Sequence, residues 1–209
     1  MASLTATQFH NPDFPDEVVN MGPEDRRNII DHYKSWSDAA IYNDLQRHCL
    51  PVEVVAENFA YDFNIATVVR NANAFNARGV HILGRKRWDR RGAVGSYHYT
   101  PVRHHTDPDA FFIKLRRQGF SVITIDNIPG SVPLEDFQWG SPRPLAVVFG
   151  QESIGVSNIA LKYADAVLRI EQYGSVRSLN VGVTSGIVLH QLASGWRTPG
   201  EAVNLPPLP

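Results

Sequence analysis

The sequence predicts an α/β fold with a parallel β-sheet, and three observations support this. From residue 51 onward, short apolar runs alternate with longer segments whose apolar residues recur at helical spacing. The runs are almost uninterrupted, which is typical of strands buried on both faces of a parallel sheet that crossover helices cover. The chain has 209 residues, enough for one such domain and an N-terminal extension.

The elements of this domain are expected in a regular β-α order. The apolar runs predict strands at 52–57, 79–84, 120–126, 144–150 and 165–170. The helical spacing predicts helices at 64–77, 107–119, 157–164 and 183–196. The helix at 107–119 has clear ends, because Asp107 can cap its first turn and Gly119 can stop it.

Two flanking segments lie outside the main domain. Residues 1 to about 22 are rich in Pro and Asp and lack periodicity, which predicts an extended arm. Helices are expected over 22–36, where Pro23 and acidic residues precede basic ones, and over about 37–48. The predicted organisation is an N-terminal arm and helical extension over 1–50, the main domain over 51–197 and a disordered Pro-rich tail over 198–209.

The composition is that of a globular protein, with 43% apolar residues, 20% charged residues and a formal net charge of -1. A surface that binds a polyanion must therefore be local. No apolar run approaches the roughly 18 residues of a membrane helix, and the N-terminus has no basic start followed by an apolar core, so no secretory signal is expected. The single cysteine, Cys49, excludes an internal disulfide, is expected to be buried, and fits a reducing cytoplasm.

A basic cluster occupies residues 85–91, whose sequence is RKRWDRR. It holds one tryptophan and five basic side chains: Arg85, Lys86, Arg87, Arg90 and Arg91. This composition suits phosphate neutralisation combined with stacking on an RNA base, although a solvated loop can have the same composition. His104 and His105 are expected to lie in a loop, and we assign no metal to them.

Three polar stretches follow predicted strands, and open α/β sheets bind ligands at the carboxyl ends of their strands. The first stretch is FNIATVVRNANAF, over residues 63–75. Asn64 is placed to cap the helix, since its side-chain oxygen can accept an early backbone N–H. Arg70 lies away from the apolar stripe, where a guanidinium can form paired hydrogen bonds with a phosphate or fix a hydroxyl. A surface arginine on an amphipathic helix is the simpler interpretation of this stretch alone.

The second stretch is VVFGQESIGVSN, over residues 147–158. A buried strand leads into Gly150, where a ligand can approach the backbone, and then into Glu152 and Gly155. Glu152 can accept hydrogen bonds or orient a basic partner. The glycine spacing matches neither the dinucleotide fingerprint nor a P-loop. An ordinary loop between a strand and a helix remains an equally good interpretation of this stretch alone.

The third stretch is GSVRSLNVG, over residues 174–182, directly before a predicted helix. Its two glycines are expected to permit backbone conformations that are closed to other residues. Ser178 and Asn180 alternate with Leu179, so in an extended segment the two polar side chains reach a common site while Leu179 packs away from it. A hydrolase is not predicted, because no G-x-S-x-G motif occurs and no acid completes a triad with His190.

Together, these stretches resemble the SpoU (TrmH-like) branch of the SPOUT superfamily, the RNA 2′-O-ribose methyltransferases. The resemblance spans about residues 60–195 and rests on three motifs in register. These are an Asn six residues before an Arg, the pattern Gly-x-Glu-x-x-Gly, and Ser-Leu-Asn-Val before a helix, matched by Asn64, Arg70, Gly150, Glu152, Gly155, Ser178, Leu179, Asn180 and Val181. The chain departs from the pattern at Glu171-Gln172, where many relatives have Pro-Met, and at Asn76, where Gly is common.

The resemblance implies a deep C-terminal trefoil knot, formed by about the last third of the domain, although general fold rules treat knots as essentially absent. It also implies that S-adenosylmethionine sits bent in this knot. The cofactor would be held mainly by backbone around Gly150, Ile170 and Leu179, with Ile125 beside them. The family works as homodimers, so each site is expected to be completed by the other subunit.

The implied reaction is the in-line attack of a ribose 2′-hydroxyl on the methylsulfonium. By resemblance Arg70 assists the hydroxyl, and because a guanidinium stays protonated, positioning and charge stabilisation are the larger part of its expected role. Asn64 and Glu152 are expected to hold Arg70, while Ser178 and Asn180 shape the pocket. In this context the 85–91 cluster is expected to contact RNA.

The substrate is expected to be tRNA or rRNA. The stretch VRSLNV is similar to that of relatives that act on the tRNA D-loop, which favours tRNA. The alternative is a catalytically inactive RNA-binding module on the same knotted fold, although all five predicted catalytic positions are filled. Methylation of a base nitrogen, as in the TrmD-like branch, needs different motifs that are absent from the sequence.

Overall fold

The computed structural model describes residues 25–57, 62–84, 88–139, 143–151 and 154–196. Within them, seven strands form one sheet in the order β3-β2-β1-β6-β4-β7-β5, and every neighbouring pair is parallel. The strands are β1 (Leu50–Glu57), β2 (Ala77–Leu83), β3 (Val102–His105), β4 (Ser121–Ile125), β5 (Val132–Pro133), β6 (Leu145–Phe149) and β7 (Ala166–Arg169). The predicted parallel α/β fold is therefore confirmed.

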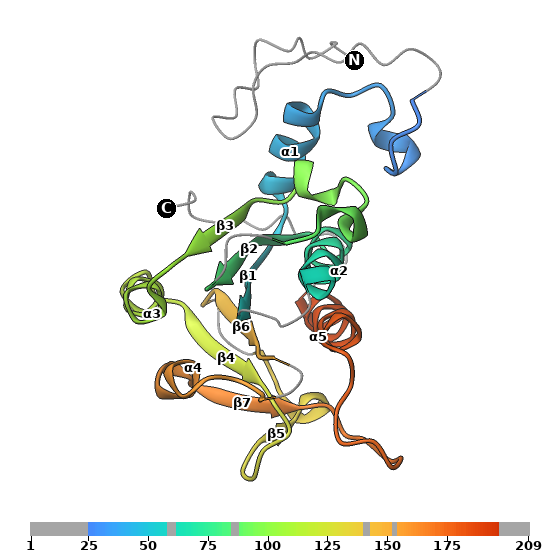
Figure 1. The fold of residues 1–209 in the computed structure, drawn as a ribbon. Helices are drawn as coiled ribbons and strands as arrows, with labels where there is room; N and C mark the ends of the chain where they lie inside the picture. The colour runs from blue at the N-terminus through green and yellow to red at the C-terminus, as the bar shows by residue number, and fades with distance from the viewer. Residues whose placement is uncertain (1–24, 58–61, 85–87, 140–142, 152–153, 197–209) are drawn as a thin grey trace.

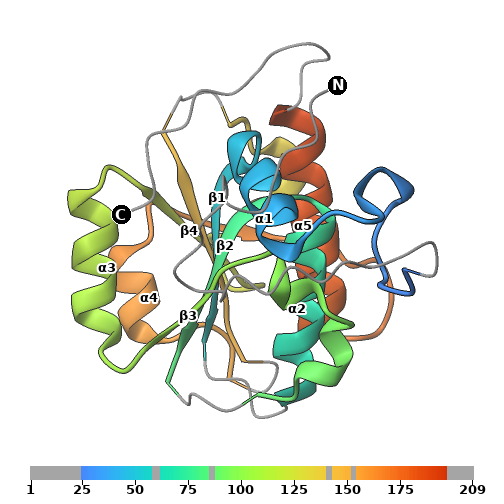
Figure 2. The same cartoon turned by 90° about the horizontal axis from the view of Figure 1, so that it is seen from above.

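Helices cover both faces of this sheet (Figures 1 and 2). α2 and α5 lie on one face, and α3 and α4 lie on the other. The α-helices are α1 (Asp38–Arg47), α2 (Asp62–Ala74), α3 (Pro108–Arg117), α4 (Asn158–Tyr163) and α5 (Val181–Trp196). Among the described residues, every helix is too short or too polar to cross a bilayer.

Burial on both faces explains the uninterrupted apolar runs. In β1, Val54 belongs to the core cluster beneath α2 and α5, whereas its neighbour Val55 belongs to the cluster beneath α3 and α4. Both side chains are fully buried. Because successive side chains of a strand point to opposite faces, a strand covered on both sides needs apolar residues at nearly every position.

The predicted helix ends at 107–119 are confirmed. Asp107 Oδ1 accepts a hydrogen bond from the backbone N–H of Ala110, as an N-cap does. Gly119 follows the helix with a φ of +82°, in the left-handed region that glycine adopts without strain. Ser157 caps α4 in the same way as Asp107, through the N–H of Ala160.

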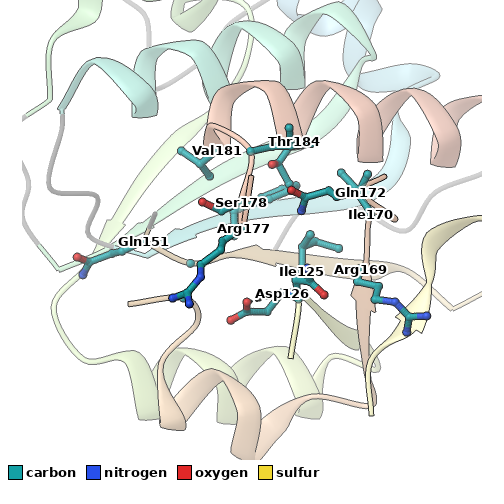
Figure 3. A pocket seen from close by; sticks show the side chains of 15 residues that line it. Ile125, Asp126, Gln151, Arg169, Ile170, Gln172, Arg177, Ser178, Val181 and Thr184 are labelled. Atoms are coloured by element: carbon teal, nitrogen blue, oxygen red, sulfur yellow. Dashed lines mark hydrogen bonds between the residues drawn. The ribbon is translucent and has the colours of Figure 1, made fainter. Parts of the chain in front are cut away.

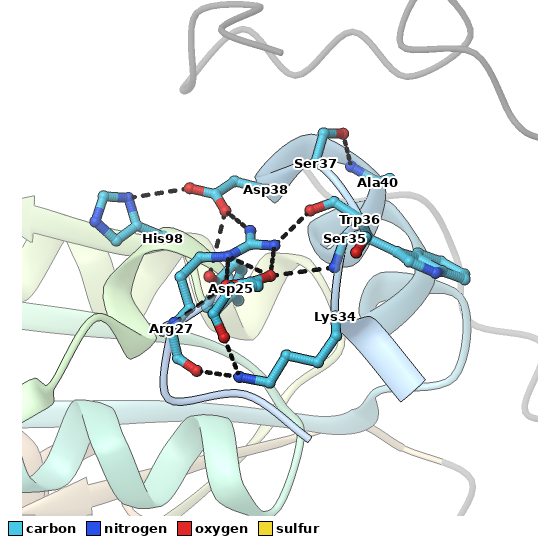
Figure 4. A network of polar contacts seen from close by, with 10 residues as sticks. Asp25, Arg27, Lys34, Ser35, Trp36, Ser37, Asp38, Ala40 and His98 are labelled. Carbon is cyan, nitrogen blue, oxygen red and sulfur yellow. Dashed lines mark hydrogen bonds and ion pairs between the residues drawn. The ribbon is translucent and has the colours of Figure 1, made fainter. Parts of the chain in front are cut away.

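The helix predicted over residues 22–36 is wrong for the part that the structure describes. Residues 25–37 contain only a 3-10 turn at Asp31–Tyr33. The Asp25 carboxylate accepts from the backbone N–H groups of Arg27 and Ser35, and Arg27 donates to the carbonyl of Trp36 (Figure 4). Such side chain–backbone bonds compete with helical ones. Here they close a loop, which is followed by α1 at the second predicted helix.

The N-terminal segment is tied to the main domain at two places. Asp38 accepts from Arg27 (Figure 4). It also accepts from the hydroxyl of Tyr99, which precedes β3. Asn76 has a φ of +51°, which Asn tolerates better than most residues, and its Nδ2 donates to the carbonyls of Leu45 and His48 at 3.1 and 3.2 Å. Asn76 therefore combines the backbone role of a glycine with a link to the end of α1.

The prediction that His104 and His105 lie in a loop is wrong, because both residues belong to β3. The mixed polarity of this strand gives no apolar run, so only its pairing with β2 identifies it. His105 Nε2 lies 2.8 Å from His81 Nδ1, and His81 Nε2 lies 3.1 Å from the buried Glu53 carboxylate. Burial and the neighbouring His81 lower the pKa of His105 to about 4.

Candidate active site

A cavity of about 160 Å³ lies at the carboxyl ends of β4, β6 and β7. A single water needs roughly 10–15 Å³ of such space, so the cavity has room for an organic ligand. Its walls come from the three strand ends and from the segment that leads into α5 (Figure 3). They comprise residues Ile125, Asp126, Asn127, Phe149, Gly150, Gln151, Gly155, Arg169, Ile170, Gln172, Arg177, Ser178, Leu179, Val181 and Thr184. This is the edge at which the sequence predicted a ligand.

The chain segment after β6 folds tightly against the cavity because of two glycines. Gln151 and Gly155 exchange backbone hydrogen bonds of 3.0 and 2.8 Å, which brings residue 155 back over residue 150. A Cβ atom at Gly150 would lie 2.3 Å from the Gly155 carbonyl carbon, so position 150 admits only glycine. The contact that the missing Cβ of Gly150 permits in the structure is this backbone crossing; the approach of a ligand to Gly150 stays a prediction.

Asp126 holds the same segment from the end of β4. Its Oδ2 accepts from the backbone N–H of Val156 at 2.9 Å, and its Oδ1 accepts from the N–H of Asn127. Gly155 has a φ of +72°, and a Cβ there would lie 2.4 Å from Asp126 Oδ2. Asp126 therefore fixes one wall of the cavity, a role that sequence reasoning missed because nothing in the pattern marks this residue.

The lining suits a ligand with a flat apolar part and several polar groups. Ile125, Phe149, Ile170, Leu179 and Val181 supply apolar walls. Polar groups come from Asp126, Gln172, Arg177, Ser178 and Thr184. Gln172 also lines the cavity, and its side-chain oxygen is buried without a hydrogen-bond partner among the described residues. All four predicted cofactor-binding residues, Gly150, Ile170, Leu179 and Ile125, line this one cavity.

Asn180 lies outside the cavity lining and has structural contacts. Its Oδ1 accepts from the backbone N–H groups of Gly182 and Val183 at 2.9 and 3.3 Å, so it caps α5. Its Nδ2 donates to Asn64 Oδ1 at 3.1 Å. The expectation that Ser178 and Asn180 face one site while Leu179 packs away is therefore wrong, since Ser178 and Leu179 line the cavity and Asn180 does not.

The expected cap role of Asn64 is also wrong. α2 begins at Asp62, so Asn64 lies inside its first turn, where it is buried and bonded to Asn180. The contact couples the start of α2 to the start of α5, across 116 residues of sequence. This long-range pair replaces the local cap that the sequence suggested.

The glycines of the third stretch do not supply unusual backbone conformations. Neither Gly174 nor Gly182 has a positive φ. Gly182 lies in α5, where a Cβ would approach Thr67 Cγ2 to 2.7 Å, so it allows α5 to pack closely on α2. Beside it, Asn71 Nδ2 donates to the Gly182 carbonyl at 2.7 Å and to Ser185 Oγ at 2.9 Å.

Arg70 is exposed on α2 and does not line the cavity of its own chain. Arg70 and Asn64 are six residues apart, roughly 120° around the helix axis, so the two side chains leave α2 in different directions. Ala66 and Asn73, one turn to either side of Arg70, face the segment before β3: a Cβ at Gly92 would lie 3.0 Å from Ala66 Cβ, and Asn73 donates to Thr100. Arg70 therefore borders residues 88–100.

Two members of the predicted RNA-binding cluster are described in this bordering segment. The Arg90 guanidinium carbon lies 5.9 and 5.3 Å from the ring centres of Trp88 and Tyr97, in cation–π range. Arg91 is highly exposed and forms a bidentate pair with Asp89. Arg85, Lys86 and Arg87 of this cluster, and the predicted catalytic Glu152, lie outside the described residues, as do the arm before residue 25 and the Pro-rich tail.

Comparison with known proteins gives the same family as the three motifs. Residues 51–190 match the SpoU rRNA Methylase family. The tRNA (guanosine(18)-2′-O)-methyltransferase of Escherichia coli is 28% identical over 156 residues, covering 73% of this chain and 67% of the relative. The family match extends over well more than half of the chain.

Solved structures show the same fold. The TrmH/SpoU tRNA modifying enzyme of A. aeolicus superposes with a TM-score of 0.68 at 22% identity, covering 76% of this chain and 81% of that chain. An AdoMet-bound rRNA methyltransferase from Sinorhizobium meliloti gives a TM-score of 0.63 at 26% identity, covering 74% and 61%. With the motifs, the cavity and the family match in agreement, the chain belongs to the SpoU rRNA Methylase family.

Proposed function

We propose that this chain is an S-adenosylmethionine-dependent methyltransferase that modifies a ribose 2′-hydroxyl of RNA, with tRNA the favoured substrate. The observation that carries the proposal is the single cavity into which the second and third motifs converge at the strand ends. Family membership supports methyl transfer, and the names of relatives support 2′-O chemistry on tRNA. The proposed location is the cytoplasm, because tRNA is found in the cytoplasm.

The cavity is the proposed cofactor site. S-adenosylmethionine, when bound, supplies a methyl group on a positively charged sulfur, which a weak nucleophile can attack. The backbone at Gly150, Ile170 and Leu179 would hold the adenosyl part, with Ile125 packing against it. Ser178 lies at the same cavity and would shape the end at which the methyl group is presented.

Arg70 is the proposed catalytic residue on the RNA side. Its exposed guanidinium borders the segment that carries Arg90 and Arg91, so the three cations can contact one RNA backbone. Because a guanidinium stays protonated, Arg70 would orient the 2′-hydroxyl and stabilise charge rather than remove a proton. Asn64 and Asn180 act through the placement of α2 and α5, and Glu152 remains a proposed partner of Arg70.

A homodimer is proposed, because Arg70 does not reach the cavity of its own chain and a second copy could supply it. Exposed apolar side chains lie on α5 and the segment before it. Tyr173 is 92% exposed and Val183 52%, and Ile187 lies one helical turn beyond Val183. Exposed apolar side chains that neighbour one another, as Val183 and Ile187 do on α5, are typical of an interface between subunits.

The trefoil knot and the N-terminal extension complete the proposed architecture. β6 lies between β1 and β4, which both precede it in the sequence. This order supports the proposed knot, in which a C-terminal segment passes between segments that come earlier in the sequence. The arm and extension would be residues 1–50, and their described part is joined to the domain through Asp38 and Asn76.

The test is transfer of labelled methyl groups from S-adenosylmethionine to total tRNA and rRNA, followed by mapping of the protected 2′-O positions. Arg70→Ala should bind the cofactor as tightly as the unaltered chain by calorimetry, yet transfer methyl groups about 100-fold more slowly, in the range of lost transition-state contacts. Arg117→Ala, an exposed arginine on α3, is the matched control and should transfer normally.

Unimpaired transfer by Arg70→Ala would remove Arg70 from the mechanism. Failure of the unaltered chain to bind S-adenosylmethionine would instead favour the inactive RNA-binding module.

A further inference from the structure

Phe63 is an aromatic side chain that the fold leaves largely in solvent. It lies in the first turn of α2 and is 57% exposed, whereas Val68 and Val69 of the same helix are fully buried. A phenyl ring has no polar group, so leaving it in water forgoes the hydrophobic free energy that burial would give. A single exposed apolar side chain is common on protein surfaces. The neighbours of this ring therefore decide whether it has a binding role.

Phe63 and the proposed catalytic Arg70 lie on one ridge of α2. They are seven residues apart, which is two helical turns, roughly 10 Å along the axis and only about 20° around it. The buried side chains of the helix, such as Ile65 and Ala72, lie on the opposite side, in the core beneath α2. Both ridge residues therefore point away from the sheet, and both are exposed.

Residues 88–100 lie along one side of this ridge (Figures 1 and 2). A Cβ atom at Gly92 would lie 3.1 Å from two ring carbons of Phe63, so the ring packs closely against the backbone at position 92. More than half of the side chain stays exposed in spite of this contact. The ring is therefore held on one side and open on the other.

The backbone that passes the ring carries cations. Gly92 directly follows Arg90 and Arg91 in the sequence. The Arg91 side chain is 90% exposed and is paired with Asp89, which offsets one of the positive charges. Together with Arg70, these cations outnumber that carboxylate, so the surface suits a polyanion.

We propose that Phe63 stacks on an unpaired base of the RNA substrate, close to the ribose that Arg70 orients. This inference rests on the proposed function and names the kind of RNA segment on which it acts. An aromatic ring beside arginines suits RNA, because the cations can hold the backbone while the ring stacks on a base. Bases inside a duplex are stacked on one another, so the segment bound at Phe63 must be a loop or another single-stranded region.

A second copy of this chain is the other occupant that an exposed ring could meet. The core of an interface between subunits is depleted in charged residues, whereas Arg70, Arg90 and Arg91 lie on the surface that holds Phe63. The proposed subunit patch on α5 has the opposite character. α5 (Val181–Trp196) contains no Asp, Glu, Lys or Arg. The charges therefore assign α5 to the subunit contact and Phe63 to RNA.

The test measures binding by fluorescence anisotropy with two labelled probes, a single-stranded oligoadenylate and a blunt RNA duplex of the same length. Phe63→Ala should lower the affinity for the single strand about tenfold, within the usual range for loss of one base–aromatic stack. It should leave the affinity for the duplex unchanged, because the cations remain. Phe63→Trp keeps an aromatic face and should retain the single-strand affinity. Phe63→Leu is apolar but lacks that face, so it should behave like Phe63→Ala.

Two further variants separate stacking from charge. Arg70→Ala should weaken the binding of both probes and lessen the dependence of affinity on salt, whereas Phe63→Ala should leave that dependence unchanged. Ile113→Ala is the matched control, since Ile113 is 36% exposed on α3, on the other face of the sheet, and should change neither affinity. Thermal melting shows that each variant folds, and light scattering gives its molecular mass.

An unchanged single-strand affinity in Phe63→Ala or Phe63→Leu would overturn the inference while leaving the proposed function intact. Equal losses for the two probes would also overturn it, since the ring would then act by placing the cations. A lower molecular mass for Phe63→Ala than for the unaltered chain would assign the ring to a subunit contact instead. If the unaltered chain bound neither probe, the inference would be overturned, and the methyl-transfer assay on tRNA and rRNA would decide the proposed function separately.

Discussion

The double role of Asn180 leads to a quantitative prediction for Asn180→Ala. The change removes the cap of α5, whose loss costs about 1 kcal/mol in the free energy of unfolding. It also removes the 3.1 Å hydrogen bond to Asn64, worth roughly 1 kcal/mol. The expected loss is therefore about 2 kcal/mol. For a chain of this size each kcal/mol corresponds to roughly 2–4 °C, so the Tm should fall by about 4–8 °C.

The assay is urea unfolding followed by circular dichroism, with the Tm measured in parallel. Asn180→Ser keeps a capping oxygen but is too short to reach Asn64, so it should recover about half of the loss. Asn64→Ala removes the same amide pair from the other side, and the double variant Asn64→Ala/Asn180→Ala should be about 1 kcal/mol more stable than the sum of the single changes predicts. A Tm within 1 °C of the unaltered chain for Asn180→Ala, or strict additivity in the double variant, would refute this account of the α2–α5 junction.

Two other predictions concern the cavity wall and the response to acid. Gly155→Ala should abolish cofactor binding, measured by calorimetry, because the new Cβ would lie 2.4 Å from Asp126. The control is Gly130→Ala, which has a similar φ of +86° and nothing within 4 Å of its Cβ, and which should bind the cofactor normally. Equal effects of the two changes would disprove the clash. His105 takes up a proton near pH 6.5 in the unfolded chain but only near pH 4 in the folded chain, because its pKa is lowered by folding. The free energy of unfolding should therefore fall by roughly 1–2 kcal/mol as the pH drops from about 6.5 to about 4. His105→Gln should flatten the dependence in urea titrations at successive pH values, and an unchanged slope would rule His105 out as its source.

The sequence alone was sufficient for the parallel sheet and the edge where the cavity lies. Both follow from local rules: a strand covered on two faces must be apolar at nearly every position, as β6 is. The ends of α3 were predictable for the same reason, since Asp107 and Gly119 act on backbone groups within a few residues.

Weakly patterned strands were not predictable. β3 carries charged residues, and β5 consists of two residues. The β structure of both therefore depends on pairing with strands that are distant in the sequence. The helix predicted over residues 22–36 is wrong for a different reason. This segment has the composition of a helix, but Asp25 and Arg27 bond to the backbone of residues 35 and 36 and close a loop instead.

The motif residues show where local reasoning ends. The sequence by itself determined which residues form the motifs and that they resemble one family, because residue identity and spacing are properties of the chain. Only the tertiary structure decided that Asn180 caps α5 and bonds to Asn64, and that Gly182 serves the packing on Thr67. The physical reason is that hydrogen bonds and close contacts join groups that are near in space, and folding brought these together from positions up to 116 residues apart.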